Sequence, residues 1–504
     1  MSDNEILPLP DNPGCYEELK DGNCYFVDKT EYLKTVFTSS TKVLLFTRPR
    51  RFGKTLLMTM FESFLKINSE KPFDTSLQQK YFQGTRILED KEFCSKFMGQ
   101  YPVISISLKN VDGVTFDIAY KNFAAEVSKL AENYRYLLSS TKLDKEDKDK
   151  LSKILKVEFL REFENSDYLT GSLSTIATAL YKEYGKYPVL LIDEYDVPLA
   201  NASYHDIQNA KLNDGDKPYK ATYHYNMVTL MKVFLGILKD QKTLTKVIIT
   251  GCLKVAKNSL FTGVNNLKVN TVLSENEDYT GIIGFTKEET YKFLKDYKMD
   301  NFAQKVKEHY DGYKFYDKEI FCPWDIVSFI SDYYKKNLKG TLKLNRLENY
   351  WEGTTSDKSL SGYLGYLTDN DNQKMQNLVD GKSISFILNE SMNYDCLSLH
   401  KSDDFWSLLL HTGYLTVDWE KTDEAELSKD SKTNKEIFAR IPNLEILECF
   451  EHNIKTRFSS EFVKLNLHNK LVDALSCGNQ KETYDIFFDM LQKYVSIRDT
   501  ATKA

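Results

Sequence analysis

Residues 43–55 have the sequence VLLFTRPRRFGKT, and this stretch decides the fold. A short apolar strand leads into a tight turn that ends in Gly-Lys-Thr, and an amphipathic helical pattern follows at once. A strand, a turn and a helix in this order predict a phosphate-binding loop, in which backbone N–H groups and the helix N-terminus hold phosphates. We expect Lys54 to reach the outer phosphates and Thr55 to offer its hydroxyl to Mg²⁺.

The loop departs from the common phosphate-binding pattern at its first position. That pattern has a glycine five residues before Gly53, where this chain has Arg48. The loop arginines (Arg48, Arg50 and Arg51) would then either contact a phosphate or the nearby carboxylates, or face outward to a partner or nucleic acid; we weight the two equally. The residues expected to contact the nucleotide are Arg48, Pro49, Arg50, Arg51, Phe52, Gly53, Lys54 and Thr55.

A second stretch supplies the acidic half of such a site. Residues 187–196 have the sequence YPVLLIDEYD, which predicts a buried parallel strand with carboxylates at its carboxyl end. Open α/β sheets bind their ligands at that edge. We expect Asp193 to hold Mg²⁺ or its water, and Glu194 to orient and deprotonate the attacking water. The plainer alternative is a strand capped by solvated acids, but together with the upstream loop the pair favours a P-loop nucleoside triphosphatase.

Three further β patterns complete a predicted parallel sheet, at residues 102–108, 246–251 and 268–273. The first falls between the phosphate loop and the acidic strand along the chain, as in P-loop proteins that use a water-activating glutamate, among them AAA-type ATPases. Thr250 ends the second pattern, where a side chain that senses the γ-phosphate would lie, although an ordinary threonine before a glycine turn fits equally well. The predicted fold class is α/β, with a P-loop NTPase core of the AAA (ASCE) type.

Composition narrows the setting of the protein. The chain has 504 residues and a net charge of −6, which gives no general case for binding nucleic acid or an anionic membrane. No apolar run is long enough to span a bilayer, and the first residues lack the features of a signal peptide, so we expect a cytoplasmic protein. The eight cysteines are scattered, which predicts free thiols. We expect ATP rather than GTP as the nucleotide.

The remaining patterns divide the chain into five expected parts. These are a lead-in with a small hairpin near 25–27 (1–35), the ATPase-like core (36–285), a helical lid (286–373), a winged-helix-like domain (374–445) and a C-terminal helical segment (446–504).

Three local patterns within these parts have their own expectations. The winged-helix prediction rests on a helix at 405–411 and strands at 414–417 and 437–441, separated by an acidic loop. Inside the core, the polar segment 200–220 predicts an exposed loop. The charge run at 143–150 predicts a solvated face, and its formal Glu-x-Lys match to restriction-type nucleases is attributed to chance.

Several motifs together resemble the bacterial AAA-ATPase-like proteins that usually carry a C-terminal nuclease of the PD-(D/E)XK superfamily. The motifs are Val27–Thr30, Arg48–Thr55, Leu191–Asp196, Ile249–Gly251, Phe261–Leu267, Gly284–Thr286, Asp311–Tyr313, Pro323-Trp324 and His411–Thr416. The resemblance covers roughly residues 10–495, and it implies that Arg48 is this family's own pattern in place of the first glycine. It also implies a nuclease after the segment matched by 446–497. The chain ends before the carboxylates and lysine of such a site, so we expect no nuclease activity from these residues.

Two classes of function follow from the sequence. The first is an ATP- and Mg²⁺-dependent switch, in which hydrolysis repositions the lid and the winged-helix-like domain. The second is a nucleotide-holding module with little turnover, whose winged-helix-like domain contacts DNA or protein. The intact set of Lys54, Thr55, Asp193 and Glu194 favours the first, because a scaffold needs no water-activating glutamate. Self-association and a protein or DNA partner are expected alongside the nucleotide, and a membrane is not.

Overall fold

The computed structural model describes most of the chain, in two compact units. The described residues are 6–10, 13–212, 222–240, 242–254, 260–264, 266–340, 347–351, 369–389, 402–422, 435–452 and, farther on, 470, 474–481, 483–486 and 488. One unit comprises residues 1–350 and 366–443, and the other comprises 351–365 and 444–504. In the second unit residues 444–452 are helical, and the Trp351 backbone N–H donates to Glu445 Oε1 at 3.3 Å. The five-part division expected from the sequence stays a prediction.

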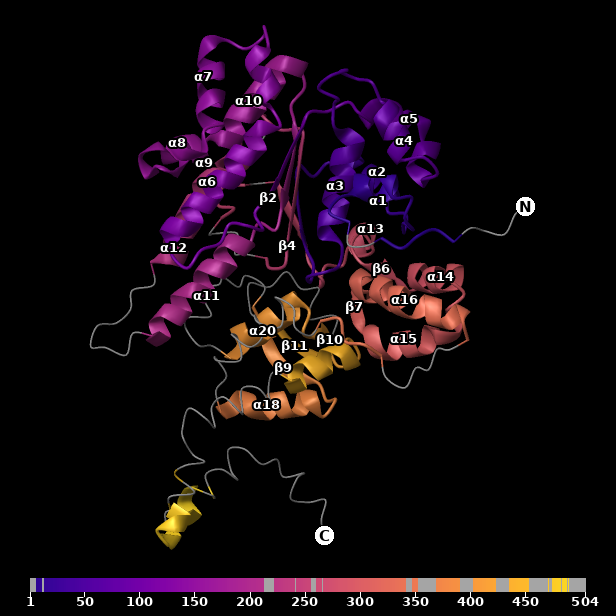
Figure 1. Cartoon of the computed structure of the whole chain (residues 1–504), viewed down its shortest axis with the longest axis vertical. Coiled ribbons are helices and arrows are strands. Elements are labelled where there is room, and N and C mark those ends of the chain that lie inside the picture. Colours follow the sequence, from indigo (N-terminus) through magenta and orange to yellow (C-terminus); the bar gives the residue numbers. More distant parts are fainter. Residues whose placement is uncertain are drawn as a thin grey trace. The chain divides into compact units, whose positions relative to one another are not determined.

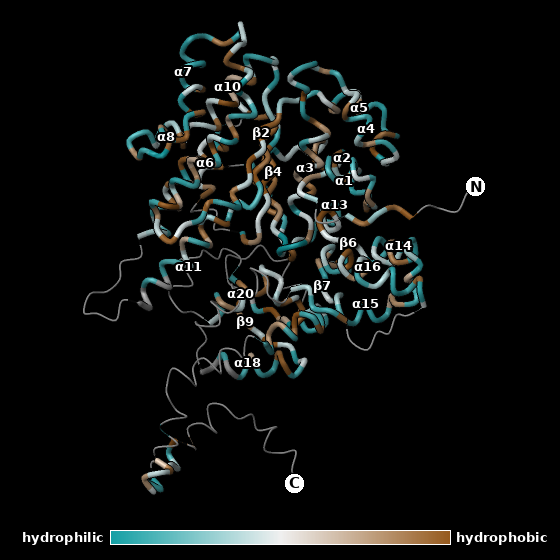
Figure 2. Tube along the Cα trace, viewed as in Figure 1, coloured by the Kyte–Doolittle hydropathy of each residue, from teal (hydrophilic) through white to brown (hydrophobic). Residues whose placement is uncertain are grey.

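A five-stranded, all-parallel sheet forms the centre of the first unit (Figure 1). Its strands are β1 (Val43–Thr47), β2 (Val103–Ser107), β3 (Val189–Asp193), β4 (Lys246–Gly251) and β5 (Leu267–Asn270). Their order in the sheet is β2-β3-β4-β1-β5, so β4 lies between the phosphate-loop strand and the acidic strand. The three inner strands are buried along their whole length, and Figure 2 shows the strands as largely hydrophobic. The predicted α/β fold with a P-loop NTPase core is confirmed.

Helices cover both faces of this sheet, as parallel β connections require (Figure 1). On the side of α3 lie α1 (Tyr16–Asp21), α2 (Glu31–Thr38), α3 (Lys54–Leu65), α4 (Ser76–Tyr81), η1 (Arg86–Glu89) and α5 (Lys91–Phe97). The other side has α6 (Phe116–Glu132), η2 (Arg135–Ser139), α7 (Lys145–Ile154), α8 (Val157–Arg161), η3 (Phe163–Asn165), α9 (Ser166–Thr170), α10 (Ser172–Tyr184), α11 (Val197–Leu212), α12 (Tyr223–Phe234) and η4 (Leu235–Lys239).

Two local predictions for the core were wrong. The segment expected to be an exposed loop from residue 200 is helical up to Leu212, as part of α11, and residues 213–220 lie outside the described residues. The hairpin expected near 25–27 does not form, because the described residues there belong to no strand. Tyr25 instead stacks on Phe293, with ring centroids 4.2 Å apart, which gives the ring a buried partner that an isolated two-stranded hairpin lacks.

The segment expected to be a helical lid contains a small antiparallel sheet as well as helices. The short helix α13 (Glu277–Thr280) precedes this segment. The helices of the segment are α14 (Lys287–Asp296), η5 (Asp300–Phe302), α15 (Ala303–Tyr310) and α16 (Pro323–Leu338). Its strands are β6 (Phe285–Thr286), β7 (Tyr313–Phe315) and β8 (Lys318–Phe321). The sheet order is β6-β8-β7. A capping box begins α14, since Thr286 and Glu289 exchange both hydrogen bonds. We call β7 and β8 with their turn the lid hairpin.

The winged-helix-like region keeps the expected helix and strands and adds one strand. Its elements are α18 (Asp369–Val379), β9 (Ile384–Leu388), α20 (Ser402–Thr412), β10 (Thr416–Val417) and β11 (Lys435–Arg440). The antiparallel order β10-β11-β9 places the last strand in the middle, and the winged-helix assignment stays a prediction. The acidic loop between β10 and β11 lies mostly outside the described residues, from 423 to 434.

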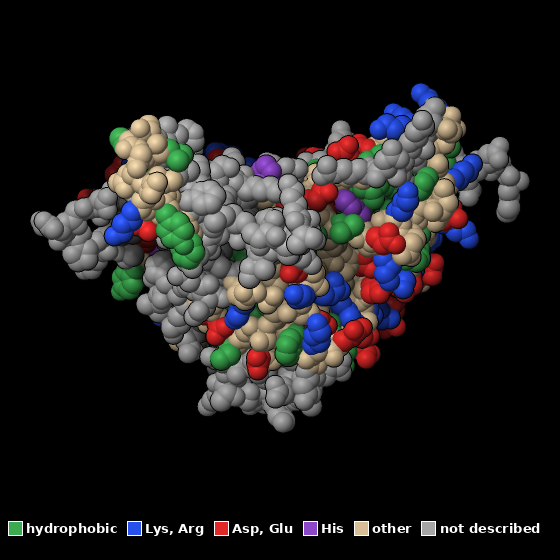
Figure 3. Space-filling model, turned by 90° about the horizontal axis from the view of Figure 1, so that it is seen from below, with side chains coloured by type: hydrophobic (Ala, Val, Ile, Leu, Met, Phe, Trp, Pro, Cys, Tyr) green, Lys and Arg blue, Asp and Glu red, His purple; other side chains and the backbone are tan. Residues whose placement is uncertain are grey.

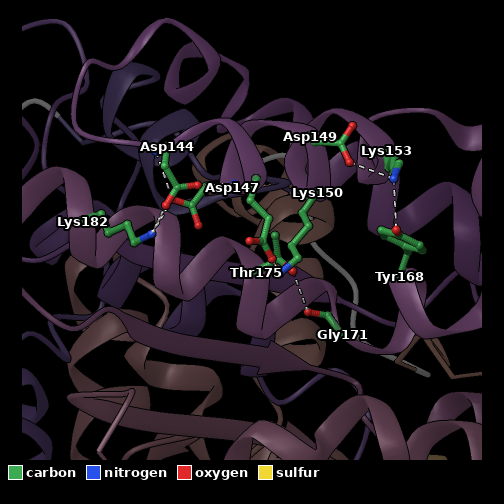
Figure 4. A network of polar contacts seen from close by, with 10 residues as sticks. Asp144, Asp147, Asp149, Lys150, Lys153, Tyr168, Gly171, Thr175 and Lys182 are labelled. Carbon is green, nitrogen blue, oxygen red and sulfur yellow. Dashed lines mark hydrogen bonds and ion pairs between the residues drawn. The ribbon is translucent and has the colours of Figure 1, made fainter.

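The charge run before residue 150 forms the exposed helix α7, whose cations and acids pair with one another (Figure 4). Lys182 of α10 contacts Asp144 and Asp147 at 3.0 and 2.5 Å, and Lys150 pairs with Glu146 at 2.6 Å. Glu146 therefore has a structural partner one helical turn away. The expected solvated face is confirmed here.

Two wider expectations concern membranes and metals. No helix within the described residues is long and apolar enough to cross a membrane. The cysteines in this part of the chain are free thiols, and their side chains form no metal-binding group with His, Asp or Glu there.

Candidate functional site

The phosphate loop joins β1 to α3 and is closed on itself by Lys54. Gly53 has φ +91°, which a glycine adopts at low cost, and α3 starts with the next residue. The Lys54 ammonium donates to the carbonyl oxygens of Arg48 at 3.0 Å and Pro49 at 2.7 Å, so it spans the turn from its far end back to its start. Its Nζ also lies 3.7 Å from Cys252 Sγ, a weak acceptor at the carboxyl end of β4. An anionic ligand oxygen would be a better partner at that position than the thiol.

The acidic strand ends directly opposite this loop. Asp193 is 6% exposed and accepts hydrogen bonds from two hydroxyls that belong to other elements. Thr55 Oγ1 of α3 donates to Asp193 Oδ2 at 2.6 Å, and Thr250 Oγ1 of β4 donates to Asp193 Oδ1. Thr250 is fully buried. It lies between the loop and the acid because β4 lies between β1 and β3 in the sheet. Thr55 and Asp193 are hard oxygen donors of the kind Mg²⁺ prefers, and they could hold that ion.

Glu194 follows the last residue of β3 and adopts a left-handed backbone conformation. Its φ is +53°, and its backbone N–H donates to Asp193 Oδ1 at 3.0 Å. Burial, with the adjacent Asp193 carboxylate as a second cause, raises the pKa of Glu194, while Lys54 acts in the opposite direction. A carboxyl whose pKa is shifted toward neutrality by burial beside a cation is a typical arrangement at functional sites.

Asp196, the next candidate for a base, has a structural role. It is 2% exposed and accepts hydrogen bonds from the backbone N–H groups of Cys252 and Leu253, at 3.0 and 2.9 Å. It therefore fixes the turn after β4, where Gly251 leaves no room for a Cβ, which would lie 2.5 Å from Asp196 Oδ1. Glu194 is the acid left to face the site.

Arg48 points away from the phosphate loop and is 1% exposed. Its guanidinium donates to the carbonyl oxygens of Thr47 (2.9 Å), Asn270 (3.1 Å) and Tyr279 (3.3 Å) and to Asn270 Oδ1 (2.5 Å). Its Cζ also lies 5.3 Å above the Phe315 ring of the lid hairpin. Burial lowers the pKa of Arg48 to about 9, so it is cationic at neutral pH. Its hydrogen bonds go to these acceptors rather than to the acids of β3, and its burial contradicts the outward-facing alternative, while a phosphate contact stays a prediction.

Arg51 and Phe52 of the loop also face the lid. Arg51 Nη1 donates to the Tyr350 carbonyl at 2.5 Å, and its guanidinium lies 5.0 Å above the Trp324 ring. Phe52 is buried against Tyr313 and Phe315, with ring centroids 5.1 and 5.7 Å apart. Burial raises the pKa of the Cys252 thiol and Arg50 acts in the opposite direction, and this thiol lies 3.7 Å from Lys54 Nζ. Of the loop arginines, Arg50 is nearest to the role expected from the sequence.

The lid hairpin in turn contacts the winged-helix-like region. Tyr313 OH donates to the Gly413 carbonyl at 2.8 Å, the Lys314 N–H donates to Thr416 Oγ1 at 3.4 Å, and Trp419 Nε1 donates to the Lys314 carbonyl at 3.1 Å. Gly312 has φ +114°, and a Cβ there would meet the Pro442 carbonyl oxygen at 1.8 Å. The Asp-Gly-Tyr and His-Thr-Gly-Tyr-Leu-Thr motifs thus meet at one contact, a role their sequences did not suggest.

A buried lysine joins the lead-in to the lid. Lys29 donates to the Gly281 carbonyl at 2.7 Å and to Glu289 Oε2 at 2.6 Å, the carboxylate that also caps α14. The sequence reasoning missed this pair, and it also missed Asn270. The signal for Asn270 was available, because it is a polar residue at the carboxyl end of an apolar strand, as Asp193 is.

Comparison with known families agrees with this geometry. Residues 14–261 match the family model described as AAA-ATPase-like, a predicted AAA-ATPase. The match spans the loop, the acidic pair and Thr250, and it suggests nucleotide binding. No match was found among curated proteins or among solved structures. The nuclease fusion and the bacterial source expected from the resemblance stay predictions.

Proposed function

We propose that the protein binds ATP with Mg²⁺ and hydrolyses it at the carboxyl edge of the central sheet. The observation that supports this best is the convergence of Lys54, Thr55, Asp193 and Thr250, from three elements, around a loop of phosphate-binding form. Such a set is what positioning and charge neutralisation of a triphosphate need. The literal Thr-Lys-x-Asp match at residues 141–144 has a structural role, because its Asp144 caps α7 and pairs with Lys182, and the proposal therefore takes ATP as the nucleotide.

The proposal assigns a role to each residue of the site. Mg²⁺, when bound, neutralises charge on the phosphate oxygens. Thr55 and Asp193 hold the ion or its water, and Lys54 contacts the outer phosphates while it keeps the loop closed. Thr250 fixes the Asp193 carboxylate and stands where a γ-phosphate would be sensed. Glu194 accepts the proton of the attacking water at its carboxylate, for which its raised pKa is suited.

Binding is tested by Lys54→Ala, with Lys66→Ala at the other, exposed end of the same helix as its control. Loss of a charge-assisted contact should weaken ATP binding by about 10–100-fold in calorimetry. The control should bind like the wild type, because Lys66 pairs only with Glu62 on the surface among the described contacts. Equal affinity in both variants would contradict the assigned binding site.

Hydrolysis is tested by two amide variants. Glu194→Gln keeps shape but loses the base, so it should bind ATP and release phosphate about 10²–10⁴-fold more slowly. Asp193→Asn should instead weaken the Mg²⁺-dependent part of binding. Turnover near that of the wild type in both variants would remove the assigned roles. A wild type that binds ATP but releases no phosphate would favour the second class of function, the nucleotide-holding module.

We further infer that the nucleotide state is coupled to the lid and the winged-helix-like region. The support is direct contact: Arg48 and Phe52 of the loop pack on the lid hairpin, and that hairpin binds Gly413 and Thr416. A shift of the loop on phosphate binding would therefore press on the hairpin. In hydrogen exchange, ATP should change the protection of residues 313–321; an unchanged hairpin in a protein that binds ATP would contradict the coupling.

The partner of this switch is a proposal of its own. The coloured Lys and Arg side chains in Figure 3 lie among Asp and Glu, so that view gives no support to a broad DNA-binding face. A protein partner, self-association and DNA all stay open as partners of the switch, and light scattering with and without ATP tests self-association. We also propose that the 504 residues of this chain do not cleave DNA. Plasmid nicking by the wild type that is lost in Asp193→Asn would overturn this proposal.

A further inference from the structure

A second pocket lies at the amino-terminal end of the sheet, away from the phosphate loop. Its volume is about 240 Å³. Its lining residues come from α1, α3 and α4 with the segment after α3, from the start of β2, and from η2 and α10. Ligand pockets for drug-sized molecules are commonly about 300–1,000 Å³, so this one suits a smaller compound. Nothing in the proposed ATPase reaction uses it.

We propose that this pocket binds a small planar organic cation of the amidinium or guanidinium class. The first reason is its aromatic lining, which comprises Tyr81, Tyr134, Tyr136 and Tyr184. The faces of aromatic rings attract cations, and planar cations stack on them. The protein already does this at the same end of the sheet, where Lys186 Nζ lies 5.4 Å from the Phe73 ring centre and 5.2 Å from that of Tyr101.

The second reason is charge. Glu17 lines the pocket, and its Oε1 accepts a hydrogen bond from Ser63 Oγ at 3.0 Å. The lining cation Lys66 is paired with Glu62 at 3.0 Å, which leaves the Glu17 carboxylate as a surplus negative charge among these three groups. The pocket also adjoins the C-terminal end of α3, which carries the negative end of the helix dipole. A cation is therefore favoured over an anion.

The third reason is the supply of acceptors and apolar contacts. Gln78 is 5% exposed; its Nε2 donates to the Lys66 carbonyl, whereas its buried Oε1 has no hydrogen-bond partner within the described residues. An amidinium offers only donors, so it matches a wall with acceptors. Two of the lining side chains, Leu77 and Tyr136, are also exposed apolar groups. They would cover the non-polar part of a bound ligand.

The test compares benzamidine with benzamide, its neutral isostere, by calorimetry on the full chain without nucleotide. Benzamidine should bind at least about tenfold more tightly, since one charge-assisted contact and a cation–π contact distinguish the two. Glu17→Gln should remove that preference. Glu18→Gln, an exposed acid of the same helix outside the pocket, should keep it.

Three results would overturn the proposal. They are equal affinity for the two compounds, a preference that survives in Glu17→Gln, and no binding of either compound. A capped arginine that binds more tightly than benzamidine would support the guanidinium member of the proposed class. Because no nucleotide is present, failure here leaves the proposed ATPase function untouched.

Discussion

Replacing Arg48 tests whether the phosphate loop is tied to the lid. Arg48→Met keeps the length of the side chain and removes a donor to four acceptors at 2.5–3.3 Å. Hydrogen bonds of charged groups contribute about 1.5–3 kcal/mol each and do not add fully. Breaking a buried charged network by removing one partner costs about 3–5 kcal/mol. Part of this cost is offset, because the variant no longer has to bury a charged guanidinium. We therefore expect a local cost of about 3 kcal/mol.

The assay is hydrogen exchange followed by mass spectrometry, because a chain of two units need not unfold in one step. A cost of about 3 kcal/mol corresponds to exchange about 100-fold faster in segments that open locally, here 268–286 and 313–321. Strand β3 should keep its protection. In Arg48→Lys the exchange rates of these segments should lie between those of the wild type and of Arg48→Met, since an ammonium keeps the charge but lacks the planar set of donors.

Arg135→Met is the matched control for this experiment. Arg135 is exposed and pairs with Glu132 at 2.6 Å, and such surface pairs contribute less than about 1 kcal/mol. It should leave both segments unchanged. If Arg48→Met exchanged like the wild type in residues 268–286 and 313–321, the tie between loop and lid would be refuted, and Arg48 would only fill space.

Three further predictions follow from single residues. Gly312→Ala should destabilise the protein by more than about 2 kcal/mol in urea denaturation, because the new Cβ would lie 1.8 Å from the Pro442 carbonyl oxygen and φ is +114°. The control Gly381→Ala, at φ +74° with open space around it, should cost about 1 kcal/mol. Equal costs in the two variants would contradict the close contact. Burial raises the pKa of Asp311 from 3.8 to about 6, with Lys307, Lys287 and Glu319 nearby, so the stability it gives is present below pH 3.8 and lost as the pH rises through 6. Asp311→Asn should then stabilise the protein at pH 7.5 by up to about 3 kcal/mol and less at pH 5, and a gain independent of pH would be evidence against this. Because the pKa of Glu194 is raised, the acid limb of phosphate release should lie above the ordinary glutamate value of 4.5, and this limb should vanish in Glu194→Gln.

The sequence by itself determined the core and the site's principal residues. Buried strands, the Gly-Lys-Thr turn and the acid pair are local patterns, and parallel strands bring their carboxyl ends to one edge whatever the details of packing. Lys54, Thr55 and Asp193 therefore lie together as the sequence predicted, and Thr250 joins them because β4 is placed between β1 and β3.

Only the tertiary structure decided where the loop arginines point and what the later motifs do. The direction of Arg48 depends on acceptors at Asn270 and Tyr279 and on the ring of Phe315, more than 200 residues away along the chain, and no local pattern encodes such partners. The same holds for the lid hairpin, whose short strands are too weak to be predicted alone and are held by contacts with Phe52 and Gly413. Local patterns fixed which residues form the edge of the sheet, whereas long-range packing fixed which of them face the phosphate side and which face the lid.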